Sequence, residues 1–304
     1  MSRRGWLLFA AMSVIWGLPY LLIKIAVAHL SPAALVFGRT AIASGILLPV
    51  ALARGELRAV ARAWLPLLAF TATEIAVPWV LLSDAELRLT SSLSGLLVAL
   101  VPLAATVFVW MAGSGDRLGR GQVAGLLLGL LGVAAVVGLD LGRVSAGALL
   151  EMAVVVCCYA VGPQIMVRWL RHLPGVGVVF GALLVAAVLY LPVAVVQRPT
   201  HGLTLSVVAS VVILGVVCTA LAFVLFFQLV EVVGAVRSTV ITFVNPAVAV
   251  ALGVAIRHEP LTAGLGVGFL LILGGSALAT RPGRPAAPPG RPRLPRAESS
   301  GVAG

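Results

Sequence analysis

Long, continuous apolar runs constrain this chain more than any other feature of its sequence. We count ten, each near the length of about 20 residues that a helix needs to cross a bilayer. Because apolar and polar residues do not alternate within these runs, the runs favour helices over the strands of a membrane barrel. The sequence therefore predicts an all-α polytopic membrane protein with ten transmembrane helices. Their approximate ranges are 6–27, 33–52, 63–82, 91–112, 121–138, 146–167, 175–196, 206–229, 235–256 and 262–280.

The composition excludes a soluble domain, and the distribution of charge predicts an orientation. The chain is 61% hydrophobic and only 10% charged, whereas soluble domains average about 25% charged residues. With a cytoplasmic N-terminus, fifteen arginines fall on the cytoplasmic side, and only Arg88, Arg143, Arg198 and Arg257 fall outside. This asymmetry follows the positive-inside rule, so both termini are predicted to be cytoplasmic. The net charge of +11 is thereby explained without nucleic acid as a partner.

An internal repeat relates the two halves of the chain. HLSPAALVFGR begins at His29 and HLPGVGVVFGA begins at His172, and in the same register Trp16 matches Tyr159. Each copy holds five apolar runs, so the second copy would enter the membrane from the opposite side. Such inverted repeats are characteristic of secondary transporters, which bind substrate near the midplane between the halves. We predict two inverted five-helix repeats, 1–140 and 141–280, and a disordered, Pro- and Arg-rich cytoplasmic tail, 281–304.

Several segments also resemble a known family. WGLPYLLIKIA, HLSPAALVFGR and LLVALVPLAATVF in the first copy, and TALAFVLFFQLVEVVGAVRSTVITFVNPAVAVALGVAIRHEPLTAGLGVGFLLILGG in the second, resemble the EamA domain of the drug/metabolite transporter superfamily. The resemblance covers roughly residues 6 to 280. It implies ten helices around a central cavity and export of amino acids or other small metabolites, and it leaves the substrate open. Asp116 replaces the family's common Glu, and Arg39 has Ala182 as its counterpart in the second copy.

Ionisable residues inside the apolar runs are candidates for function, because a buried charge costs several kcal/mol unless it is paired or hydrated. Glu74 is expected near the midplane, where it would either exchange a proton with substrate movement or pair structurally with Arg39. Arg39 would either bind a substrate carboxylate or anchor two helices. Glu151 is a candidate for the outer vestibule. Lys24 lies close enough to its helix end for snorkelling to explain it.

Aromatic residues and loop acids give weaker signals. Trp16 and Tyr159 occupy equivalent positions, each before a helix-disrupting proline, and either ring would face substrate or simply pack; Trp79 has the same two readings. Asp116 and Glu259 each precede a new helix, where an acid would meet the positive end of the helix dipole. We interpret both as structural helix-cap acids.

The sequence lacks the motifs of catalysis, nucleotide binding and metal binding. It contains no HExxH, GxxxxGKS/T or GxSxG segment, and its three cysteines have no zinc-site spacing. We therefore predict no enzyme activity, cofactor or metal. The predicted function is a secondary transporter of small metabolites such as amino acids, with export as the expected direction and proton coupling as one form of drive. The alternatives are a membrane scaffold or sensor without turnover, and a lipid or drug carrier of the same fold.

Two further expectations concern the setting. Twenty arginines against one lysine, with abundant Ala, Gly and Val, indicate a GC-rich bacterium, and hence the bacterial cytoplasmic membrane as the location. The expected partners are a small-molecule substrate and the lipid bilayer. The sequence leaves the oligomeric state open.

Overall fold

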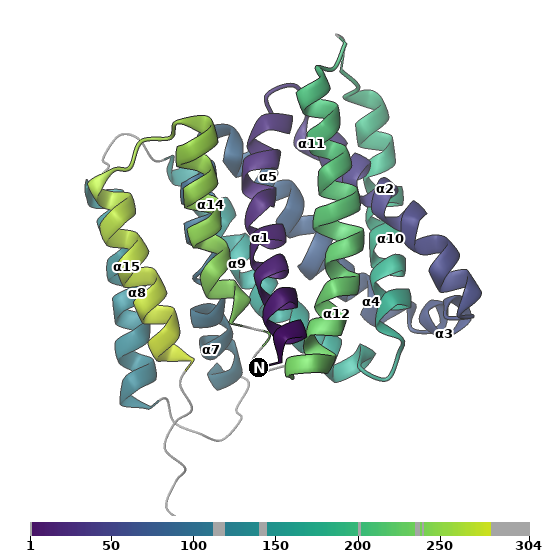
Figure 1. The fold of residues 1–304 in the computed structure, drawn as a ribbon, viewed down its shortest axis with the longest axis horizontal. Helices are drawn as coiled ribbons and strands as arrows, with labels where there is room; N and C mark the ends of the chain where they lie inside the picture. Colours follow the sequence, from purple (N-terminus) through teal and green to yellow (C-terminus); the bar gives the residue numbers. More distant parts are fainter. Residues whose placement is uncertain are drawn as a thin grey trace, which may run out of the picture.

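The computed structural model describes residues 2–111, 119–139, 145–199, 202–234, 238 and 240–280. All secondary structure within these residues is helical, so the all-helical prediction is confirmed for this part of the chain. The helices run up and down roughly side by side, and the N-terminus lies at the same end of the molecule as the short helix α3 (Figure 1). Asp116 and the tail 281–304 lie outside the described residues.

The helices and π-helical segments follow one another along the chain with short connections. Their bounds are α1 Arg3–Ala26, α2 Pro32–Ala53, α3 Leu57–Arg62, α4 Trp64–Thr71, η1 Ala72–Ala76, α5 Val77–Arg88, α6 Ser91–Val98, α7 Val101–Met111, α8 Arg120–Leu139, α9 Ala146–Ile165, η2 Met166–Leu170, α10 Gly175–Val196, α11 Leu205–Gly215, η3 Val216–Leu221, α12 Ala222–Val233, α14 Ile241–Arg257 and α15 Ala263–Ala279.

Eight helical stretches in the described residues are long and apolar enough to cross a membrane. Two further apolar helices, α14 and α15, are shorter at 17 residues each. Large apolar side chains cover the outside of the bundle, among them Val196, Leu270 and Leu130 with exposed fractions of 84%, 73% and 67%. Such a surface is stable against lipid and not against water, which indicates a protein embedded in a bilayer.

Two of the predicted runs differ from the helices in the structure. The third run was expected to end at residue 82, but the helical stretch from Trp64 continues to Arg88. The fourth run is broken between α6 and α7, just before Pro102, which has no N–H to donate. Ser276 of α15 donates its hydroxyl hydrogen to the carbonyl of Ala99 at 2.6 Å. This bond satisfies a backbone group that the break leaves without a helical partner.

Glycines bring α8 and α15 into close contact at one edge of the bundle (Figure 1). A β-carbon at Gly275 would lie 2.6 Å from the carbonyl oxygen of Gly125 and 2.7 Å from the backbone nitrogen of Gly129. Membrane helices rely on such small residues, because lipid supplies no hydrophobic force that drives helices together. The glycines at equivalent positions of the two halves therefore pack the last helix of one half against that of the other.

We expect Gly275→Leu to destabilise the protein by roughly 1–3 kcal/mol, because the backbone of α8 cannot move aside as a flexible side chain would. The measurement is thermal unfolding of the purified variant in detergent. Gly274→Leu is the matched control, since nothing lies within 4 Å of a β-carbon at Gly274. Equal melting temperatures for the two variants would contradict this packing.

Candidate functional site

Two widened helical turns lie at equivalent positions of the two halves. The register that pairs His29 with His172 also maps η1 onto 215–219, which overlaps η3. After η1, Pro78 has no N–H, so the regular α-helical ladder is interrupted there. The hydroxyl of Tyr190 in α10 donates to the carbonyl of Ala76 at 2.9 Å, which provides a partner at this irregular turn. π-helical turns are frequent at functional sites, and these two carry Glu74 and Thr219.

Arg39 of α2 is buried between the two halves, with an exposed fraction of 5%. Its guanidinium carbon lies 3.6 Å from the centroid of the Trp79 ring, and its Nη2 donates to Thr219 Oγ1 at 3.1 Å. Its Nε is buried without a hydrogen-bond acceptor. The cation is thus held by stacking and one neutral hydroxyl, and no carboxylate of the described residues pairs with it.

Glu74 lies close to α9, against the backbone of Gly162. A β-carbon at Gly162 would overlap the Glu74 carboxylate, so the glycine makes room for the acid. The Oε2 atom is buried and has no hydrogen-bond partner. Tyr159, one turn before Gly162 on the same helix, is near enough to interact electrostatically with both Glu74 and Arg39. The structure thereby gathers Glu74, Arg39, Trp79 and Tyr159 in one region.

Glu74 and Arg39 do not form an ion pair. In the described part of the chain, ion pairs join Arg54 to Glu56, and Arg88 to Asp84 and Glu151. The structural pair that we considered from sequence is therefore absent from this conformation. Arg39 Nε and Glu74 Oε2 are each left without a hydrogen-bond partner.

Trp16 lies elsewhere, in an aromatic cluster with α12. Its ring is 4.9 Å from that of Phe226 and 6.2 Å from that of Phe223, centroid to centroid, the latter in a T-shaped arrangement. Although Trp16 and Tyr159 are equivalent in the repeat, only Tyr159 lies beside the charged groups. Packing accounts for the contacts of Trp16 in this structure.

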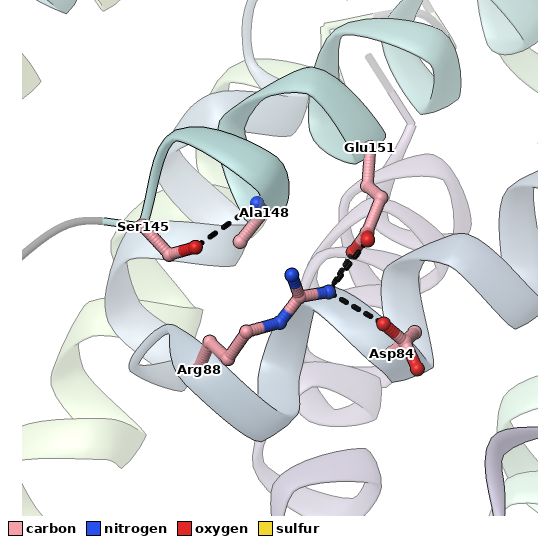
Figure 2. A network of polar contacts seen from close by, with 5 residues as sticks. All are labelled: Asp84, Arg88, Ser145, Ala148 and Glu151. Atoms are coloured by element: carbon pink, nitrogen blue, oxygen red, sulfur yellow. Dashed lines mark hydrogen bonds and ion pairs between the residues drawn. The ribbon is translucent and has the colours of Figure 1, made fainter.

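Glu151 belongs to a polar network at the ends of α5 and α9 (Figure 2). Arg88 donates from Nη2 to the carboxylates of both Asp84 and Glu151, and Ser145 caps the start of α9 through the Ala148 N–H. These side chains are partly exposed, so the pairs contribute little to stability. The network links the two helices, and it engages the carboxylate that we had considered for a vestibule.

Glu259 caps a helix, but not the one that the sequence suggested. Its carboxylate accepts hydrogen bonds from the backbone N–H and hydroxyl of both Ser91 and Ser92 at the start of α6. The following helix, α15, is capped instead by Thr262, which accepts from the Leu265 N–H at 3.1 Å. Glu259 therefore ties a loop of the second half to a helix of the first, which sequence proximity alone does not reveal.

We expect acid to weaken the contact of Glu259 with Ser91 and Ser92. Burial acts to raise the pKa of Glu259, but the bonds from Ser91 and Ser92 outweigh it and hold the pKa below its ordinary value. A lowered carboxyl pKa stabilises the fold above the unfolded value of about 4.3, and this contribution disappears as pH falls through the folded value. Glu259→Gln should therefore cost about 1–2 kcal/mol at neutral pH and flatten the acid side of the stability profile.

The measurement is the melting temperature from about pH 7 down to about pH 2.5. Glu231→Gln is the control, because Glu231 is exposed on α12. If Glu259→Gln loses stability on acidification as steeply as the wild type, the tie makes no pH-dependent contribution.

A fully buried acid near the end of α5 was not predicted from the sequence. Glu86 has an exposed fraction of 0%, and neither of its carboxylate oxygens has a hydrogen-bond partner. Glu86 lies beyond residue 82, where the sequence predicts the end of the third run. In the structure it continues a buried helical face formed by Trp79, Leu82 and Ser83. The amine of Lys24 donates to the backbone carbonyls of Glu86 and Leu89, so it caps the end of α5.

The apolar helices, with buried ionisable side chains among them, define a multi-pass membrane protein. The chain belongs to the EamA-like transporter family, which it matches over residues 3–138 and 146–281. The resemblance noted from sequence is thereby confirmed, and the chain is a membrane transporter and not an enzyme.

Two individual proteins are similar to the chain over most of its length. One is an uncharacterized transporter, YvbV, of Bacillus subtilis (strain 168). It is 27% identical over 276 residues, and the match covers 90% of this chain and 90% of YvbV. The other is a solved structure described only as "Crystal structure of protein". It has 22% sequence identity and a TM-score of 0.64, over 90% of this chain and 96% of that one. The latter likeness concerns the fold alone.

Proposed function

We propose that this transporter is a secondary exporter of small amphipathic metabolites, with amino acids as the first substrate class to test. It has ten transmembrane helices in two inverted five-helix repeats, and both termini are cytoplasmic. It works by alternating access in a bacterial cytoplasmic membrane, with the substrate held between the halves. The internal repeat that pairs His29 with His172 and the arginine distribution support this topology.

The observation that carries the proposal is the state of Arg39. A buried guanidinium without a carboxylate is costly, yet here it is stacked on Trp79 and its Nε has no acceptor. A guanidinium presents parallel donors that match a carboxylate. The α-carboxylate of an amino acid would supply the missing negative charge, and Trp79 would hold the guanidinium plane in position for it.

Glu74 provides the complementary half of the site. Its Oε2 has no donor in this conformation, and the ammonium group of an amino acid would supply one. When substrate leaves, a proton on the carboxyl would neutralise the charge in its place. Substrate and proton then compete for Glu74, and this competition exchanges one for the other across the membrane.

Counterflow in proteoliposomes tests the transport of this substrate class. Vesicles loaded with one unlabelled amino acid should accumulate the same labelled amino acid, with saturation and with competition by only some members of a panel. Protein-free vesicles are the control. Absence of exchange for every amino acid, from folded and inserted protein, would overturn this choice of substrate.

The same assay separates the alternatives. Exchange of cationic drugs or of lipid analogues, in place of amino acids, would favour a carrier of the same fold with another cargo. A membrane scaffold or sensor would exchange none of these compounds. Arg39 favours an anionic group in the cargo, because a purely cationic drug would leave its charge unbalanced.

A further inference from the structure

Glu86 occupies a second buried polar position, distinct from the region of Arg39 and Glu74. It lies on α5, and its neighbours along the chain, Leu82, Ala85 and Leu89, belong to an apolar core cluster. Its exposed fraction is 0%, and both carboxylate oxygens lack a hydrogen-bond partner. An ionised carboxylate in such surroundings would lose its hydration without compensation.

Charged and titratable neighbours come from two other parts of the chain. Tyr20 and Lys24 of α1 and Glu259 of the loop between α14 and α15 are near enough to interact electrostatically with Glu86. On the other elements packed against α5, α9 carries Tyr159 and Glu151, η1 carries Glu74 and α2 carries Arg39. Glu151 of α9 pairs with Arg88, and Arg39 of α2 stacks on Trp79. Lys24 is thus the cation placed to compensate a charge on Glu86.

Lys24 nevertheless does not bind the carboxylate. Its amine donates to the backbone carbonyls of Glu86 and Leu89 at the end of α5. If Glu86 were ionised, an ammonium this close would gain far more from the carboxylate than from neutral carbonyls. The arrangement is the one expected when Glu86 carries a proton.

We propose that Glu86 is a proton-binding site at the ends of α1 and α5, and that Lys24 responds to its occupancy. With the proton bound, Lys24 caps the carbonyls of α5. When the carboxylic O–H gives its proton to water, the carboxylate forms, and the Lys24 ammonium moves from the carbonyls to it. The end of α5 then loses its cap, and an ion pair between Lys24 and Glu86 replaces the contact of Lys24 with the α5 carbonyls. This site is additional to Glu74, and it does not depend on the identity of the cargo.

Stability as a function of pH tests the site without a transport assay. A proton held by the folded state stabilises it at low pH, and this stabilisation is lost as pH rises and the proton dissociates. We expect the melting temperature of the wild type to fall by several degrees between about pH 5 and about pH 9, and that of Glu86→Gln to change less. Glutamine has nearly the same shape as glutamate and stays neutral over this whole pH range. Lys24→Met should steepen the fall, and the double variant should remove it.

Infrared spectroscopy provides a second readout that does not rely on stability. The difference between low- and high-pH spectra of the folded wild type should contain the carbonyl band of a buried carboxylic acid. This band should persist in part in Glu74→Gln, because Glu86 contributes to it, and it should be weaker in Glu86→Gln.

Three results would overturn the proposal. The first is an identical pH profile in the wild type and Glu86→Gln. The second is an unchanged infrared band in that variant. The third is a loss of stability that sodium chloride prevents and choline chloride does not, which would assign the position to a sodium ion. Failure of amino-acid counterflow would leave all three readouts unaffected, so the two proposals fail separately.

Discussion

Arg39→Lys is expected to lower the rate of amino-acid counterflow by roughly 10- to 100-fold, while the protein still folds and inserts. Lysine keeps the positive charge but offers a point charge in place of a planar fork, so it can neither stack on Trp79 in the same way nor hold a carboxylate bidentately. A hydrogen bond to a charged group contributes about 1.5–3 kcal/mol, and about 1.4 kcal/mol corresponds to a factor of ten.

Arg168→Lys is the matched control for this experiment. Arg168 also lies over a tryptophan, with its guanidinium carbon 5.7 Å from the Trp169 ring centroid, but both residues are exposed. We expect near wild-type counterflow from it. Equal rates for the two lysine variants would show that Arg39 serves only to pack helices together.

Glu74→Gln is expected to abolish the dependence of exchange on pH, because glutamine cannot take up or release a proton. Accumulation driven by a pH gradient should disappear, whereas counterflow, which needs no net proton movement, should persist at a reduced rate. The measurement compares both assays at about pH 6 and about pH 8. Persistence of gradient-driven accumulation in this variant would exclude Glu74 as the coupling group.

Glu231→Gln provides the control for Glu74→Gln, since it removes an exposed acid on α12. Glu86→Gln, tested in the same two assays, distinguishes the roles of the two buried acids. If Glu74 couples transport and Glu86 responds to protons at the helix ends, only Glu74→Gln should eliminate gradient-driven accumulation. Glu86→Gln should chiefly alter the dependence of stability on pH.

The residues of the central region could be proposed from sequence because burial of charge is visible in a hydropathy pattern. Arg39 and Glu74 each interrupt an otherwise apolar run, and a charge inside a membrane helix is rarely tolerated without a role. Their relation to one another was not visible. The sequence did not decide whether they form a salt bridge. In the structure Arg39 stacks on Trp79 and donates to Thr219 instead.

Glu86 and Glu259 show where hydropathy ceased to help. The end of the third run looked polar, because Asp84, Glu86 and Arg88 alternate there, yet only Glu86 turns inward. Glu259 precedes α15 in the chain but binds Ser91 and Ser92 of α6. Its partners belong to the other half of the chain, and local rules for helix caps carry no information at that distance.

Hydropathy and repetition were sufficient to predict the class of fold. Uninterrupted apolar runs of membrane-spanning length admit helices, since a helix satisfies its own backbone in lipid, and the internal repeat related the two halves. Which polar side chains meet one another depends instead on the folded arrangement. Helix rotation and tilt are set by packing, such as that of Gly125 against Gly275, and they determine whether a given acid faces a cation, a serine pair or no partner at all.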